Sequence, residues 1–262
     1  MRPTALTIAG SDPSGGAGIQ ADLKTFHQFG VYGMTAITLL TVQNTTRVKD
    51  VLLIEPSMVR AQIEAVLEDI PPNAIKTGAL GNETIIRAVA DSIRHLHIPL
   101  VVDPVMISKH DKALLDQHSI DALKTELLPL ATLVTPNIHE AESLSGHTIE
   151  NFEEMKTAAK KIKGLGMSAV LIKGGHFKFA EADAIDLFWD GVEFECFRSP
   201  RILSTNTHGT GCTYSAAITA NLAKGLDLKP AIDLSKKFIQ LAIEKADKIG
   251  HGYGPVNHFV LP

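Results

Sequence analysis

The chain has 262 residues, of which 45% are hydrophobic, 21% charged and 5% aromatic, and its formal net charge is -4. This composition excludes disordered, collagen-like and coiled-coil proteins. A weakly acidic chain without a dense run of Lys and Arg is not a general nucleic-acid binder either, because binding to the phosphate backbone needs a basic surface. A chain of this length can bury one full-sized core, so we expect a single domain over residues 1–262.

Two cysteines, Cys196 and Cys212, are too few for a disulfide framework and lack the spacing of a zinc site. The sequence opens on an apolar strand pattern, without the charged and then apolar regions of a secretory signal. Its apolar stretches, such as residues 31–42, fall far short of the roughly 20 residues that a membrane span needs. We therefore expect a cytoplasmic protein.

Short apolar runs alternate with amphipathic stretches along most of the chain. The apolar runs predict buried strands at residues 5–9, 34–42, 74–77, 100–103, 132–135 and 169–172. Helical periodicity predicts helices at residues 19–29, 58–67, 84–96, 119–127 and 155–165. Such alternation predicts an α/β fold with a mostly parallel sheet that helices cover on both faces.

The pattern changes after residue 175. Residues 183–189 and 192–197 flank an Asp-Gly pair and predict a β-hairpin with a tight turn. Two more helices are predicted at residues 212–224 and 230–248. In open α/β sheets ligands bind beyond the carboxyl ends of the strands, so polar residues that follow the predicted strands are candidate site residues.

The first such segment, residues 10–22, reads Gly-Ser-Asp-Pro-Ser-Gly-Gly-Ala-Gly-Ile-Gln-Ala-Asp. It fits a loose dinucleotide fingerprint, but the next strand ends at Gln43 and its neighbour Asn44 instead of the acid that holds a ribose. The sequence contains no Walker A motif. A flexible turn with a helix cap would explain the glycines, but the four glycines and the isolated Asp22 favour close approach of a small molecule.

The second segment, residues 206–213, reads Asn-Thr-His-Gly-Thr-Gly-Cys-Thr and precedes a helix of small residues. Glycines at a helix start leave N–H groups free at the positive end of the dipole, where phosphate or an oxyanion binds. Cys212 falls in the first turn, where we expect a lowered thiol pKa. A capped helix with a buried cysteine is one alternative. A hydrolase with Cys212 as nucleophile and His208 as base is another, although no third group to orient the histidine is evident.

Polar residues also follow the later strands. Asp103 ends a strand before Pro104, where a carboxylate either binds a cation or caps a turn. Asn137 and Glu140 have capping-box spacing, which favours a helix cap, and Glu140 can also reach Mg²⁺ through water. Lys173 follows another strand, either as a phosphate partner or as a surface residue.

Together these segments resemble a known family. The matching stretches are residues 5–26, 32–33, 42–45, 103–106, 135–137, 173–176, 207–213 and 254–259. They make the chain similar, along essentially its whole length, to the hydroxymethylpyrimidine/phosphomethylpyrimidine kinases of the ribokinase-like superfamily. The resemblance implies a central, mostly parallel sheet with helices on both faces and a small late hairpin. It also implies two ATP-dependent phosphorylations in thiamine biosynthesis, first of 4-amino-5-hydroxymethyl-2-methylpyrimidine and then of its monophosphate.

The resemblance also implies roles for single residues. The substrate-binding residues would be Gly10, Asp22, Gln43, Ala79 and Val105. Cys212 would be the base, where related sugar kinases carry Asp, and the γ-phosphoryl group would bind Gly209, Thr210 and Gly211. ATP would bind Asn137, Lys173 and Thr207, and Mg²⁺ would bind Asp103 and Glu140. The carried-over roles of Asp22 and Gln43 are chemically reasonable, because the two side chains offer the acceptor and donor that a pyrimidine ring needs.

Two segments depart from the family pattern. Ala79 stands where the family has Met, which enlarges the expected pocket and keeps pyridoxal or pyridoxine kinase activity as the alternative. The expected lid, residues 108–115, lacks a glycine that the family has, which stiffens a segment meant to close over the substrate. A non-catalytic binding protein could keep the pocket, but Cys212 and Asp103 argue against it. The superfamily also favours a homodimer, and a potassium requirement stays open.

Overall fold

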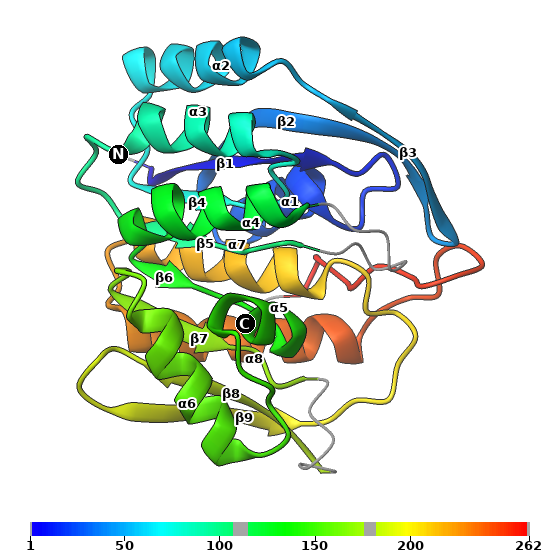
Figure 1. The fold of residues 1–262 in the computed structure, drawn as a ribbon. Coiled ribbons are helices and arrows are strands. Elements are labelled where there is room, and N and C mark those ends of the chain that lie inside the picture. The colour runs from blue at the N-terminus through cyan, green and yellow to red at the C-terminus, as the bar shows by residue number, and fades with distance from the viewer. Residues whose placement is uncertain (1, 107–114, 176–181, 261–262) are drawn as a thin grey trace.

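The computed structural model describes residues 2–106, 115–175 and 182–260. Within these ranges nine strands form one sheet in the order β3-β2-β1-β4-β5-β6-β7-β8-β9 (Figure 1). The strands are β1 (Thr4–Ser11), β2 (Tyr32–Asn44), β3 (Arg47–Leu53), β4 (Ala74–Thr77), β5 (Leu100–Val102), β6 (Leu133–Val134), β7 (Ala169–Ile172), β8 (Asp183–Trp189) and β9 (Phe194–Pro200). Residues 108–114 of the lid expected at residues 108–115 lie outside the described ranges.

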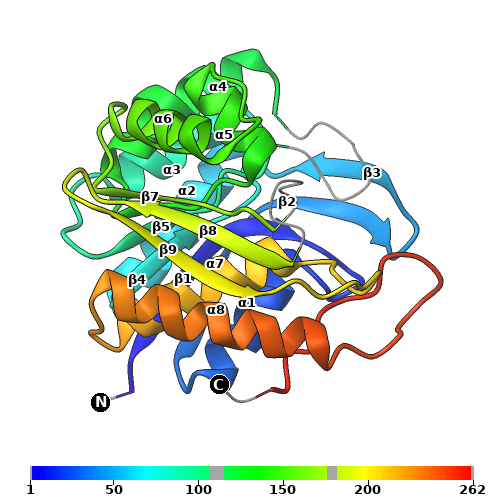
Figure 2. The same ribbon diagram turned by 90° about the horizontal axis from the view of Figure 1, so that it is seen from below.

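Helices cover both faces of the sheet (Figure 2). One face carries α2 (Pro56–Asp69), α3 (Glu83–Ile93), α4 (Gln117–Ala122), α5 (Ile138–Ser145) and α6 (Phe152–Lys163), and the other carries α1 (Gly18–Gln28), α7 (Thr210–Ala223) and α8 (Leu228–Glu244). Each layer of helices closes a separate apolar core against the sheet. Within the described ranges, no helix is long and apolar enough to cross a membrane.

The strands from β2 through β1, β4, β5 and β6 to β7 are parallel, so their carboxyl ends share one edge of the sheet. The outer strands β3, β8 and β9 are antiparallel to their neighbours. The expected α/β architecture, mostly parallel with a late hairpin, is confirmed. Its shared edge is where ligands bind in open α/β sheets.

Helix α7 packs against the sheet and against α1 and α8, and all of its residues from Thr213 onward are buried. Its sequence is rich in Ala, Ser and Thr, and such small side chains let a helix approach its neighbours closely. Ser215 reaches Asp103 at the end of β5, so the packing brings the first turn of α7 to the carboxyl edge.

The sequence pattern does not predict β3. Its residues Arg47, Lys49 and Asp50 are exposed, and it pairs with the outer half of β2 in a two-stranded ribbon beyond the core. A strand without a buried face has no apolar run by which to recognise it.

The late hairpin has a longer turn than the tight Asp-Gly turn that the sequence suggests. Trp189 pairs with Phe194, so residues 190–193 form the loop. The Asp190 carboxylate accepts the N–H groups of Val192 at 2.8 Å and Glu193 at 2.9 Å. This side-chain cap stabilises the wider loop.

Two helices differ at their C-terminal ends from the sequence-based prediction. The helix expected at residues 119–127 is α4 followed by a π-helical turn (Leu123–Leu127) and a 3-10 turn (Leu128–Leu130), in which Pro129 prevents a regular continuation. Helix α8 ends at Glu244 instead of residue 248. Asn257 of the C-terminal segment donates to the carbonyl oxygens of Ala242 and Lys245 and so satisfies the helix end.

Candidate active site

A lysine and an aspartate meet at the carboxyl edge of the sheet. Lys173 follows β7 and Asp103 follows β5, and Nζ lies 2.8 Å from Oδ1. A Cβ placed on Gly211 would lie 3.2 Å from Lys173 Nζ and 3.6 Å from Asp103 Oδ2, so the pair directly contacts the turn that opens α7. Burial opposes the charge of Lys173, but Asp103 and Glu140 raise its pKa. The structure thus places an ammonium ion beside the predicted phosphate-binding turn.

The turn before α7 depends on glycine. Gly209 is the N-cap residue with φ 78°, a left-handed conformation that L side chains rarely adopt, and a Cβ there would collide with Gly16 O. The N–H and hydroxyl of Thr210 both donate to Thr207 O, at 3.3 and 2.7 Å. The N–H groups of a first helical turn have no intrahelical acceptor, so this turn presents donors to an anion.

Cys212 is the third residue of α7, as predicted, but its thiol is not acidified. The sulfur accepts the N–H of Gly18 at the start of α1, so two helix N-termini meet at this residue. Burial raises the pKa of Cys212 to about 11 against the opposing effect of Lys76. The expectation of a lowered pKa is therefore wrong, because loss of solvation outweighs the helix field.

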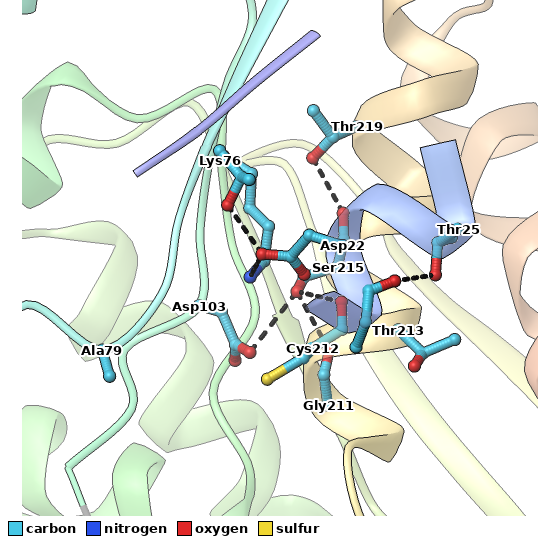
Figure 3. Close-up of polar contacts among 12 residues, drawn as sticks. Asp22, Thr25, Lys76, Ala79, Asp103, Gly211, Cys212, Thr213, Ser215 and Thr219 are labelled. Carbon is cyan, nitrogen blue, oxygen red and sulfur yellow. Dashed lines mark hydrogen bonds and ion pairs between the residues drawn. The ribbon is translucent and has the colours of Figure 1, made fainter. Parts of the chain in front are cut away.

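Asp22 lies beneath the turn, sealed from solvent (Figure 3). Its Oδ2 accepts the ammonium of Lys76 at 2.8 Å and the hydroxyl of Thr7 at 2.6 Å, while Oδ1 has no partner among the described residues. From the sequence, Asp22 was expected to face the substrate. The structure instead shows an ion-pair partner of Lys76, and the substrate contact stays a prediction.

Asn137 and Glu140 form the capping box that their spacing predicts. Asn137 Oδ1 accepts Glu140 N–H at 2.9 Å, and Glu140 Oε2 accepts Asn137 N–H at 2.8 Å. Asn137 also pairs through its backbone with Lys173, which places both beside Asp103. Burial raises the pKa of Glu140 to about 7, opposed by Lys173 and reinforced by Asp103.

These residues fit a magnesium ion. No set of three or more His, Cys, Asp and Glu side chains in the described ranges is arranged to enclose a metal. Mg²⁺ instead keeps several waters and needs only one or two carboxylates besides the substrate phosphates. Asp103 and Glu140 are two such carboxylates, and they lie close enough together that Asp103 adds to the effect of burial in raising the pKa of Glu140.

Three other predicted site residues, Gly10, Ala79 and Val105, belong to or follow the carboxyl ends of parallel strands. Gly10 is buried against Leu39, and its carbonyl lies against Gly18. Half-buried Val105 lines a hollow of about 10 Å³ beside Asp103. Ala79 follows β4 and lies apart from the group around Cys212 in Figure 3.

Two buried residues at this site, Asp12 and Lys76, were not predicted from the sequence. Asp12 is buried, and its carboxylate bonds to His208 and to Gln43, which was expected to bind substrate. Lys76 is the fully buried partner of Asp22. The local sequence contained one indication of this pair, a lysine within the predicted buried strand at residues 74–77.

The sequence and the fold of this chain match those of known proteins. The sequence model of the family described as phosphomethylpyrimidine kinase matches residues 12–257. A hydroxymethylpyrimidine/phosphomethylpyrimidine kinase of Synechococcus elongatus is 47% identical over 98% of this chain and 97% of its own length. The thiamine biosynthesis bifunctional protein ThiED of Geobacter sulfurreducens is 47% identical over 99% of this chain, which covers 53% of that protein.

Among solved structures, an ADP complex of Bacillus subtilis pyridoxal kinase superimposes with a TM-score of 0.90 at 42% identity, covering 98% of both chains. The family match spans nearly the whole chain and includes both glycine-rich turns. The chain therefore belongs to the phosphomethylpyrimidine kinase family.

Proposed function

We propose that the chain transfers the γ-phosphoryl group of ATP to the hydroxyl of 4-amino-5-hydroxymethyl-2-methylpyrimidine and then phosphorylates the monophosphate to the diphosphate. The observation that carries this proposal is the Gly-Thr-Gly-Cys turn at the start of α7, with Lys173 and Asp103 against it. Phosphoryl transfer depends mostly on positioning and charge stabilisation, which an anion-binding turn and an ammonium ion supply.

In the first step, the substrate hydroxyl attacks the γ-phosphorus while its proton moves to the thiolate form of Cys212 and the bond to ADP breaks. The N–H groups of Gly209 and Gly211 and the ammonium of Lys173 would balance the charge of the transferring group. Asn137 and Thr207 lie at the same edge and would bind the other ATP phosphates. Gly10, Gln43, Ala79 and Val105, with Asp22 beneath, would form the pyrimidine site.

Asp103 and Glu140 would hold Mg²⁺, partly through water. The ion supplies positive charge to the phosphate oxygens during transfer. A potassium requirement is a separate expectation, and replacement of potassium salts by tetramethylammonium salts tests it.

The second step differs chemically, because the acceptor is a phosphate oxygen that is already ionised near neutral pH. It needs no general base, whereas the alcohol of the first step does. A base role for Cys212 therefore predicts unequal effects of its removal on the two reactions.

Replacement of Cys212 by Ala should lower kcat for the alcohol by about 100-fold or more, the usual contribution of a general base. The same variant should lose much less activity on the monophosphate. Because the pKa of Cys212 is about 11, kcat of the unsubstituted chain for the alcohol should also rise with pH between about 7 and 9 as the thiolate fraction grows. Turnover by coupled ADP assay measures each quantity.

Cys196→Ala is the matched control, since Cys196 lies on β9 in the hairpin, away from α7. Equal losses on both substrates, or unchanged turnover in the Cys212 variant, would contradict the base role. Inert pyrimidine substrates with the unsubstituted chain would contradict the proposed function itself.

A pyridoxal kinase activity is the second candidate. It is supported by the close match to the Bacillus subtilis pyridoxal kinase structure and by the small residue Ala79. Parallel measurement of kcat/KM on the pyrimidine alcohol, its monophosphate and pyridoxal separates the two. Preference for pyridoxal by orders of magnitude would reverse the order of the candidates.

We also propose one domain, a cytoplasmic location and a homodimer. One sheet contains strands from residue 4 to residue 200, and both cysteines are unpaired thiols, as in a reducing compartment. The β2–β3 ribbon exposes Leu40, Val42 and Leu52 on one face, since Leu40 pairs with Leu52 across the strands. This apolar face supports pairing with a second copy, which light scattering of the purified chain tests.

A further inference from the structure

Asp12 organises the first glycine-rich loop, which connects β1 to α1. Its Oδ1 accepts the N–H of Ser14 at 2.9 Å and its hydroxyl at 2.7 Å. Its Oδ2 accepts the N–H groups of Gly16 at 3.2 Å and Ala17 at 2.9 Å. Burial disfavours the charged form, but hydrogen bonds from His208, Gln43 and Ser14 hold the pKa of Asp12 well below its usual range. The loop is thus wrapped around one buried carboxylate.

His208 extends this network to the second glycine-rich turn. Its Nε2 lies 2.8 Å from Asp12 Oδ2, and because an ionised carboxylate only accepts, Nε2 must donate. The backbone of His208 is fixed on the other side, where its N–H donates to Gly254 O at 2.9 Å and its carbonyl accepts the N–H of Val256 at 3.3 Å. His208 immediately precedes Gly209, so the carboxylate of one turn orients the residue that leads into the other.

The two turns also touch directly. A Cβ on Gly209 would collide with Gly16 O, and a Cβ on Gly16 would collide with the ring of His208. Cys212 Sγ accepts the N–H of Gly18, which follows the same loop. The contact between the turns is therefore continuous from the Asp12–His208 pair to the sulfur of Cys212.

From this geometry we propose that the Asp12–His208 pair is a positioning device, which locks the loop at residues 10–18 against the turn at residues 207–212. It would fix the distance between the bound alcohol, held by the first turn, and the γ-phosphoryl group and Cys212, held by the second. The proposal rests on the kinase function proposed above. His208 acts here through Gly209 and Cys212 and does not touch the substrate.

A purely structural role is the alternative, because a buried aspartate that caps a loop contributes to folding wherever it occurs. Asp190 offers a comparison within the same chain, since its carboxylate also accepts two backbone N–H groups in a turn. That turn joins β8 to β9, at the opposite end of the strands from the site. Asp190→Asn therefore reports what loss of a loop cap does without a change in the two glycine turns.

The decisive pair of variants is His208→Ala and His208→Gln. Ala removes the donor to Asp12, whereas Gln can place an amide N–H near the position of Nε2. We expect His208→Ala to lower kcat by about 100-fold, as misplacement of reacting groups by about 1 Å does, with a much smaller change in KM. His208→Gln should recover most of kcat. Asp12→Asn combined with His208→Ala should lose less than the product of the single losses, as coupled residues do.

A second readout does not depend on any substrate. The chain has two thiols, so the rates at which iodoacetamide alkylates Cys212 and Cys196 can be compared in one sample by peptide mass spectrometry. If the Asp12–His208 pair holds the turn, His208→Ala should raise the ratio of the Cys212 rate to the Cys196 rate several-fold. His208→Gln and Asp190→Asn should leave the ratio unchanged.

The outcomes separate this proposal from the kinase proposal. An inert unsubstituted chain with a raised alkylation ratio in His208→Ala would refute the substrate assignment and retain the positioning role. The positioning role is refuted if His208→Ala keeps the wild-type kcat and alkylation ratio, or if Gln fails to restore what Ala loses. It is also refuted if Asp190→Asn lowers kcat as much as His208→Ala does.

Discussion

Two lysine-aspartate pairs of the same length have very different surroundings. Lys76–Asp22 and Lys173–Asp103 both place Nζ 2.8 Å from a carboxylate oxygen. The first pair is 0% exposed at both side chains and has Thr7 as a further partner. In the second, Lys173 keeps 14% exposure and lies against Gly211 at the opening of α7. Burial therefore separates a pair closed to ligands from one whose lysine is partly exposed where we propose that phosphate binds.

The difference has an energetic meaning. A buried ion pair gains little over an apolar pair, but removal of one partner leaves a charge without compensation. Lys76–Asp22 should then be needed mainly for folding. Its lysine also lies beneath Cys212 and acts to lower the pKa of that thiol. Lys173, which can reach an incoming anion, should be needed mainly for turnover. Substitutions of one lysine at a time test this difference between the two pairs.

Lys76→Met should have the largest effect. Methionine fills similar space but leaves the Asp22 carboxylate buried without a cation, which typically costs about 3–5 kcal/mol. Urea unfolding measures the loss. Lys237→Met serves as control, because Lys237 and Asp233 are exposed partners and such pairs contribute about 1 kcal/mol or less. A loss of unfolding free energy no greater than that of the control would contradict the expectation that Lys76–Asp22 behaves as a buried ion pair.

Lys173→Met should lower kcat by about 100-fold, the usual loss when one preorganised donor to transition-state charge is removed. It should destabilise the fold less than Lys76→Met, because Asp103 keeps the Ser215 hydroxyl at 3.4 Å and lies at the edge of the sheet. The rate of ADP formation gives kcat, and urea unfolding of the same preparation gives the stability. Loss of stability without loss of kcat would show that Lys173, like Lys76, serves folding and not turnover.

A third pair, Lys236–Asp186, should show the smallest effect. Asp186 also accepts the N–H of Gly174 at 3.0 Å, so it keeps a donor when Lys236 is changed. We expect Lys236→Met to cost about 1–3 kcal/mol of unfolding free energy, the range for one lost partner of a buried polar group. Turnover should stay near that of the unsubstituted chain. A fall in kcat would show that Asp186 and Lys236 act on Lys173 through Gly174.

Strands buried on both faces were predictable from the sequence, whereas the exposed ribbon strand was not. β7 is a continuous apolar run, and β1 and β4 are buried strands with few polar residues, because helices cover both sides. β3 presents Arg47, Lys49 and Asp50 to solvent and has no such run. A buried strand needs apolar residues and can therefore be recognised in the sequence, whereas backbone pairing at a solvated edge needs no particular residues.

The same distinction holds for the site. The Gly-Thr-Gly-Cys turn was predictable because a local backbone conformation requires its glycines. The direction of the Cys212 pKa was not, since it depends on burial that the fold creates. The Lys76–Asp22 and Asp12–His208 partners stand 54 and 196 residues apart, so no local pattern could pair them.

The wide turn of the late hairpin is a suitable place to attach a label. Its residues cap the end of β8 that pairs with the start of β7, so the turn points away from the carboxyl edge where the site lies. Val192 in this turn is 87% exposed. A fluorophore or a tether to a sensor surface attached at residue 192 would thus immobilise the enzyme with its substrate entrance facing outward.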